Sequence, residues 1–126
     1  MSMMAAPARP ESRSIAIAVV GKDHNPLEGA AVSFFEDDKL FGTVITGIRG
    51  ASITLSHVVR SIDVKVVYAD SKQETTVSAS EASYTFVFAR KFDFKAPKAI
   101  AQCPNGDTGQ PCVDCVVDGK KIRICA

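Results

Sequence analysis

The residues best equipped to do chemistry are four cysteines, which all lie near the C-terminal end of the 126-residue chain. They are Cys103, Cys112, Cys115 and Cys125, with the spacing C-x8-C-x2-C-x9-C. The segment that holds them has few apolar residues, so burial alone cannot keep it folded. We therefore expect a covalent or metal staple in this segment.

Tetrahedral zinc on four thiolates is the first candidate staple. Cys112 and Cys115 have the C-x2-C spacing that suits two ligands on one zinc ion, and Cys103 and Cys125 would complete the set. The second C-x2-C pair of a zinc ribbon is missing. Zinc is thus the cofactor that the spacing favours, although the motif is incomplete.

Disulfides are the second candidate, because the dipeptide Asp118-Gly119 is a strong signal for a two-residue hairpin turn. If Val117 pairs with Lys120 across this turn, the register places Cys112 opposite Cys125. A cross-strand bridge between these two cysteines is then feasible.

The disulfide alternative leaves Cys103 to pair with Cys115. Against it, the cytosol keeps most thiols reduced. A thiol redox pair at Cys112 and Cys115, or an iron–sulfur site, is a third alternative. A C-x2-C thiolate is best activated at a helix N-terminus, however, and this one lies beside strands. In each alternative the segment is structural first.

The remaining chemical groups predict no catalytic site. We interpret His24 as a solvated loop residue and His57 as the end of a strand, because no nucleophile or orienting carboxylate accompanies either one. Residues 36–38 (EDD) resemble a cation site only superficially, since the glycine and further oxygen ligands of a calcium loop are missing. We interpret them as a solvated hairpin turn and expect no enzyme activity.

Composition limits the elements that position these groups. With 46% hydrophobic and 23% charged residues, the chain matches ordinary globular usage and the size of one domain. A net charge of +1 provides no field for nucleic acid or an anionic membrane, so neither is an expected partner. No apolar run has the length of a membrane span or a signal peptide. The expected location is cytoplasmic, or extracytoplasmic if the cysteines are disulfide-bonded.

Short β-rich runs, separated by turn residues, begin at residue 14 and predict an all-β fold without helices. We expect a seven-stranded Greek-key sandwich over 14–94, preceded by a disordered tail at 1–13. A linker at 95–102 then leads to a cysteine-stapled β-hairpin at 103–126. The predicted strands of the sandwich are 14–20, 31–36, 40–46, 51–57, 62–68, 73–78 and 83–91.

Two strings suggest a family. Residues 17–32 read IAVVGKDHNPLEGAAV, and residues 46–55 read TGIRGASITL. The pattern P-L-x-G-A-x-V followed by T-x-x-x-G resembles the carboxypeptidase-regulatory-like or transthyretin-like (prealbumin-like) β-sandwich modules. The resemblance implies a rigid stabilising, spacing or ligand-presenting module. Independently of it, Gly29 and Gly50 are expected at tight corners that need positive φ.

These observations predict a non-catalytic interaction or structural module with a protein partner, bound through exposed strand edges or the stapled hairpin. The alternative is a thiol redox or small-ligand-binding protein that uses Cys112 and Cys115. Sugar binding is disfavoured because the chain has no tryptophan and two tyrosines. The long run at 83–94 leaves self-association through edge strands open.

Overall fold

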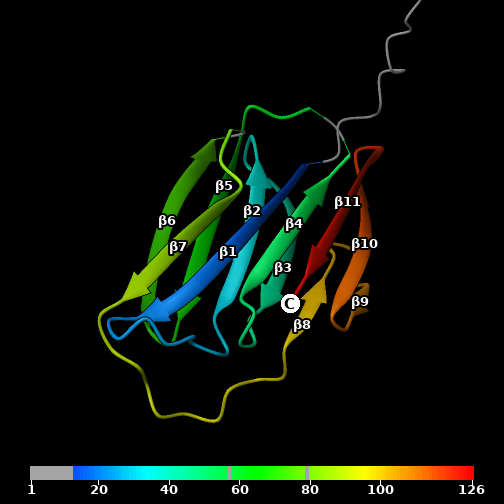
Figure 1. Cartoon of the computed structure of the whole chain (residues 1–126). Helices are drawn as coiled ribbons and strands as arrows, with labels where there is room; N and C mark the ends of the chain where they lie inside the picture. The colour runs from blue at the N-terminus through cyan, green and yellow to red at the C-terminus, as the bar shows by residue number, and fades with distance from the viewer. Residues whose placement is uncertain (1–12, 57, 79) are drawn as a thin grey trace, which may run out of the picture.

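The computed structural model describes residues 13–56, 58–78 and 80–126, and it consists of two β-sheets packed face to face (Figure 1). The predicted tail, except for Arg13, and the candidate His57 lie outside the described residues. In the part that is described, no helix could cross a membrane.

The first sheet has five strands in the order β10-β11-β4-β1-β7. The second has six, in the order β6-β5-β2-β3-β8-β9. Neighbouring strands are antiparallel, except that β1 and β7 run parallel. The strands are β1 (Arg13–Gly21), β2 (Ala31–Glu36), β3 (Lys39–Ile45), β4 (Ala51–Leu55), β5 (Ser61–Tyr68), β6 (Ser71–Ser78), β7 (Ser83–Phe88), β8 (Ile100–Gln102), β9 (Thr108–Gly109), β10 (Cys112–Val117) and β11 (Lys120–Cys125).

The core lies between the sheets, because alternate residues of each strand point inward. On β1 the inward side chains are isoleucine or valine and the residues between them are more exposed. The same alternation gives a continuous apolar layer across both sheets. Its largest fully buried side chains include Phe34, Phe41, Tyr68, Ile15, Ile17, Ile53, Leu55, Ile62, Ile122 and Ile124.

The all-β prediction is confirmed, and each of the seven predicted runs corresponds to one of the strands β1 to β7. The C-terminal region differs from the predicted division. The predicted linker at 95–102 contains β8, which pairs with β3, and the hairpin at 103–126 is joined to the first sheet where β11 pairs with β4. The reason is burial: Ile122 and Ile124 alternate with polar residues and complete the core beside β4.

A buried hydroxyl ties the loop after β1 to the end of β3. Thr46 is 1% exposed, and its Oγ1 accepts a hydrogen bond from the Ala30 N–H at 3.0 Å and donates one to the Leu27 carbonyl at 2.9 Å. These residues belong to the two strings singled out in the sequence. Thr46 thus satisfies two backbone groups that the core would otherwise leave without partners.

The expected positive φ at Gly29 and Gly50 is confirmed, with values of 86° and 76°. Gly50 also lies against the backbone of β1, where an added Cβ would collide with the Ile17 carbonyl oxygen. Glycine is therefore required at residue 50 both for its backbone conformation and for the close approach of β1.

The free edge of β7 is partly capped by the other sheet. The Ala16 N–H of β1 donates to the Ala82 carbonyl. Successive residues of a strand turn their backbone groups to opposite edges, so the even-numbered residues of β7 bond to β1. The N–H and C=O groups of Thr85 and Val87 therefore face away from β1. The Gln73 Nε2 of β6 donates to the Val87 carbonyl at 2.8 Å. Gln73 therefore occupies an acceptor that a further strand would need.

We expect the substitution Gln73→Ala to raise the association constant for dimers about fivefold, because an edge hydrogen bond contributes roughly 1 kcal/mol. Sedimentation equilibrium would measure this constant. Thr75→Ala on the same strand is the matched control and should behave as wild type. Equal dimerisation of the two variants would contradict the capping role of Gln73.

Candidate functional site

The four cysteines form two disulfides, which pair Cys103 with Cys115 and Cys112 with Cys125. The Cα atoms of the first pair are 5.5 Å apart, and those of the second are 4.0 Å apart. No free cysteine remains. These are the two pairs that the disulfide alternative named, so the staple in the structure is covalent.

The Cys112–Cys125 disulfide links β10 and β11 on the outer face of the first sheet. The Asp118-Gly119 turn has positive φ at both residues, and Val117 pairs with Lys120 and Cys112 with Cys125, as the predicted register required. Cys125 alternates with the buried isoleucines of β11, so its side chain points outward. Both cysteines of this disulfide are half-buried.

The Cys103–Cys115 disulfide joins the two sheets. Cys103 directly follows β8 of the second sheet, and Cys115 lies on β10 of the first. The two residues are 4% and 3% exposed, and both belong to the hydrophobic core. This bond therefore closes one side of the sandwich from within.

The C-x2-C motif does not act as a pair. Cys112 and Cys115 lie three positions apart on a strand, so their side chains point to opposite faces and their Cα atoms are about 10 Å apart. That is too far for a disulfide between them, and each is bonded to a different partner. Among the described residues, no group of three or more His, Cys, Asp or Glu could hold a metal ion. The geometry thus supports neither the zinc site nor the redox pair.

One edge of β10 has backbone groups that no strand pairs. The Ala126 N–H donates to the Pro111 carbonyl, just outside the pair Cys112–Cys125. In an antiparallel ladder, hydrogen-bonded pairs alternate with non-hydrogen-bonded pairs, and a bond in this position makes Cys112–Cys125 a non-hydrogen-bonded pair. Alternation then turns the N–H and C=O of Asp114 and Val116 toward the outer edge of β10. Cys103 Sγ lies 3.5 Å from the Asp114 carbonyl oxygen, so the backbone groups of Val116 are the more open ones. Val116 is also 68% exposed.

Beside this edge, a shallow hollow of about 370 Å³ lies on the outer face of the first sheet. Arg123 crosses it to Asp114, with 3.3 Å between the guanidinium nitrogen and the carboxylate oxygen. The hollow is lined by Thr54, Ser56, Asp114, Cys115, Val116, Lys121, Ile122 and Arg123.

The other groups noted in the sequence lie in turns. His24 is exposed, as expected, in the loop after β1. In the same loop, the Asn25 backbone N–H and side-chain amide donate to the Asp23 carboxylate and lower its pKa below the usual value. Asp37 and Asp38 form the predicted hairpin turn, both with positive φ.

Two exposed ion pairs connect the β2–β3 hairpin with the β10–β11 hairpin. Lys39 Nζ lies 2.7 Å from the Asp118 carboxylate, and Lys120 Nζ lies 3.2 Å from that of Glu36. Exposed pairs of this kind contribute little to stability. They do align the tip of the stapled hairpin with the second sheet, a relationship that no local sequence signal shows.

Sequence reasoning missed an aromatic anchor at the opposite end of the molecule. Tyr68 packs against Phe88, Phe92 and Phe94, with ring centroids 5.6 to 5.8 Å apart, and its hydroxyl accepts a hydrogen bond from the Phe92 N–H at 3.0 Å. This anchor holds the segment at 89–99, which crosses from β7 to β8 below the sandwich (Figure 1). The aromatic spacing F-x-F at 92–94 was the one available signal.

No family model, curated protein or solved structure matches this chain. The geometry of the site therefore carries the functional argument. Its distinguishing feature is β10, an edge strand that contributes one cysteine to each disulfide.

Proposed function

We propose that this protein is a non-catalytic β-sandwich module that binds an extended segment of a partner protein along the free edge of β10. The observation that carries the proposal is that β10 is fixed at two points in different directions. Cys112 ties it sideways to β11, and Cys115 ties it inward to the second sheet. An edge strand fixed in this way cannot fray.

Strand addition needs unpaired backbone groups that are already in the extended conformation. The edge of β10 offers the N–H and C=O of Val116, next to its exposed side chain, and the N–H of Asp114, whose carbonyl is in contact with Cys103 Sγ. A partner strand gains main-chain hydrogen bonds there, and the rigid template lowers the conformational entropy lost on binding. The other long edge of this sheet, β7, is less suited because Gln73 occupies the Val87 carbonyl.

The finer fold assignment is also part of the proposal: a transthyretin-like, seven-stranded Greek-key sandwich extended by the hairpin. The order of the strands supports it, since β4-β1-β7 face β6-β5-β2-β3 and the later strands add to one side of each sheet. It is also supported by the residues 17–32 and 46–55 that resemble the family, because the hydrogen bonds of Thr46 and the tight corner at Gly50 lie within them.

The disulfides favour an oxidising, extracytoplasmic compartment as the place where the module works. The partner is then a protein of the same compartment. Synthesis in a reducing compartment would leave the four cysteines as thiols, and β10 would lack these two constraints.

A phage-displayed library of random dodecapeptides tests the proposal. We expect the wild-type protein to enrich peptides with alternating β-branched residues, and the substitution Val116→Pro to weaken their binding at least tenfold. Proline removes the N–H that faces the free edge, and the β10–β11 ladder survives because this N–H does not take part in it.

Val116→Thr is the matched control, because it keeps the N–H and changes the side chain alone. Its affinity for the selected peptides should stay within about threefold of the wild type, a difference below roughly 0.7 kcal/mol. If no peptide is enriched, or if the peptides bind Val116→Pro as tightly as Val116→Thr, then strand addition at β10 is wrong.

A further inference from the structure

The two disulfides differ in how far a reagent could reach them. Cys103 and Cys115 lie in the core between the sheets, at 4% and 3% exposure. Cys112 and Cys125 are half-buried on the outer face of the first sheet. A thiol can therefore approach the outer bond from solvent, and the inner bond is covered by both sheets.

The fold does not depend on the outer bond to keep the hairpin in place. The Asp118-Gly119 turn sets the register, and four residues of β11 pair with β4. Ile122 and Ile124 remain buried, and the inner disulfide still ties β10 to the second sheet. Opening the outer bond therefore frees the end of the hairpin at Pro111 and Ala126 without unfolding the domain.

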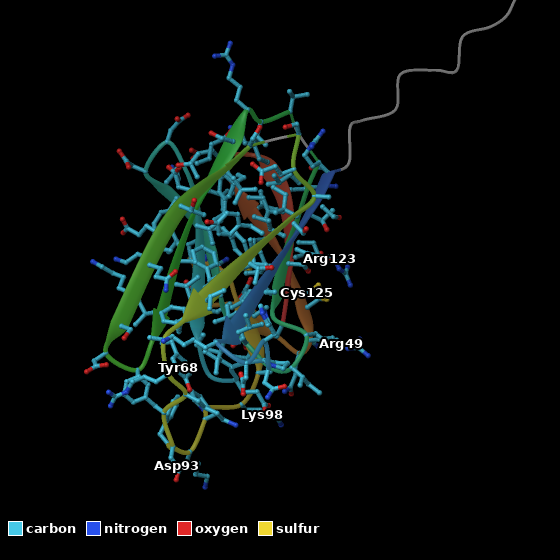
Figure 2. All side chains as sticks on the ribbon, turned by 60° about the vertical axis from the view of Figure 1, so that its left-hand side comes forward. Arg49, Tyr68, Asp93, Lys98, Arg123 and Cys125 are labelled. Carbon is cyan, nitrogen blue, oxygen red and sulfur yellow. A yellow bond between two sulfur atoms is a disulfide. The ribbon has the colours of Figure 1, made fainter. Side chains whose placement is uncertain are left out.

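In the described part of the chain, one uncompensated positive charge lies on the same side of the molecule as the outer bond. Figure 2 shows Cys125 between Arg123 and Arg49 along one side of the molecule. Arg49 lies in the turn before β4, three residues before Ser52, the residue that pairs with Cys125. Arg123 is paired with Asp114, and among the described residues Arg49 forms no ion pair. The uncompensated charge of Arg49 favours the approach of an anionic thiolate.

We propose that the Cys112–Cys125 bond is a site of reversible thiol–disulfide exchange for an external thiol, carried by a small molecule or by a protein. The external thiolate forms a new S–S bond with the Sγ of one cysteine, and the Cys112–Cys125 bond breaks. The departing electron pair leaves the other Sγ as a thiolate, which takes a proton from water. Attack of this thiolate on the mixed disulfide reverses the step and releases the external thiol.

This inference is independent of strand addition and is tested on the native wild-type protein. Reduced glutathione and reduced thioredoxin are added in separate experiments, samples are quenched by alkylation, and peptide mass spectrometry follows each disulfide. We expect the Cys112–Cys125 bond to open at least about tenfold faster than Cys103–Cys115, with a glutathione adduct on Cys112 or Cys125. Opening by thioredoxin as well would show that the site admits a protein thiol, and opening by glutathione alone would limit it to small thiols.

Two further measurements separate exchange at a native site from reduction of unfolded chains. Hydrogen exchange of the β4 and β11 amides should stay slow while the outer bond opens. The double variant Cys112→Ala/Cys125→Ala should form no adduct under the same conditions. Equal opening rates for the two disulfides, or loss of amide protection at the same rate as opening, would overturn the proposal. Both of these results are measured on the wild-type protein, so they do not depend on whether the double variant folds.

Discussion

Replacing Cys103 and Cys115 together by alanine is expected to lower the free energy of unfolding by about 3 to 5 kcal/mol. The bond closes a loop with a sequence separation of 12 residues, for which loss of the chain constraint alone accounts for roughly 3 kcal/mol. Both sulfurs also leave the core, where their removal creates a cavity between the sheets. Urea denaturation followed by far-ultraviolet circular dichroism would measure the change.

The outer disulfide provides the matched control for this prediction. Cys112 and Cys125 close a loop of nearly the same length, with a separation of 13 residues, but their side chains lie outside the core. We expect the variant Cys112→Ala/Cys125→Ala to lose about 2 to 3 kcal/mol, less than the inner variant. If the inner variant is as stable as the outer one, then the inter-sheet bond does not have the structural role assigned to it.

The substitution Thr46→Val should lower the free energy of unfolding by about 2 to 6 kcal/mol, although valine has nearly the same shape. Inside the core, the hydroxyl of Thr46 accepts a hydrogen bond from the Ala30 N–H and donates one to the Leu27 carbonyl. Valine leaves both groups buried without a partner, at a cost of roughly 1 to 3 kcal/mol for each. Thermal and urea unfolding would both report the loss.

Two control substitutions show whether the loss of stability comes from the buried hydroxyl of Thr46. Thr46→Ser keeps the hydroxyl and should cost about 1 kcal/mol for the lost methyl group. Thr43→Val removes a hydroxyl that contacts Ser33 Oγ at 3.2 Å in a half-buried position, and should cost less than about 1 kcal/mol. A Thr46→Val variant as stable as Thr43→Val would show that the Thr46 hydroxyl does not bridge the corner.

Local signals predicted most of the secondary structure. The alternation of apolar and polar residues located β1 to β7 within a few residues, since that alternation is imposed by the pleat of a half-buried strand. The Asp118-Gly119 dipeptide located the hairpin and its register, because two consecutive residues with positive φ need such a pair. The register in turn placed Cys112 opposite Cys125.

Relations between distant segments could not be predicted in this way. Gln73 and Val87 lie on different sheets, and Tyr68 holds a segment more than 20 residues away, with a separation of 24 residues to Phe92. Such contacts depend on how the two sheets are stacked. The strand at the end of the predicted linker 95–102 was not foreseen for the same reason, since β8 pairs with the edge of β3, far away in the sequence.

The sequence by itself determined that this chain forms β-strands and a tight C-terminal hairpin, because turn chemistry and side-chain alternation act over a few residues. Only the tertiary structure decided what the four cysteines do. The C-x2-C spacing suggested two ligands on one ion, but an extended strand points Cys112 outward and Cys115 inward. That divergence, fixed by the pairing of β11 with β4, separates the two disulfides into an inner bond between sheets and an outer bond at the surface.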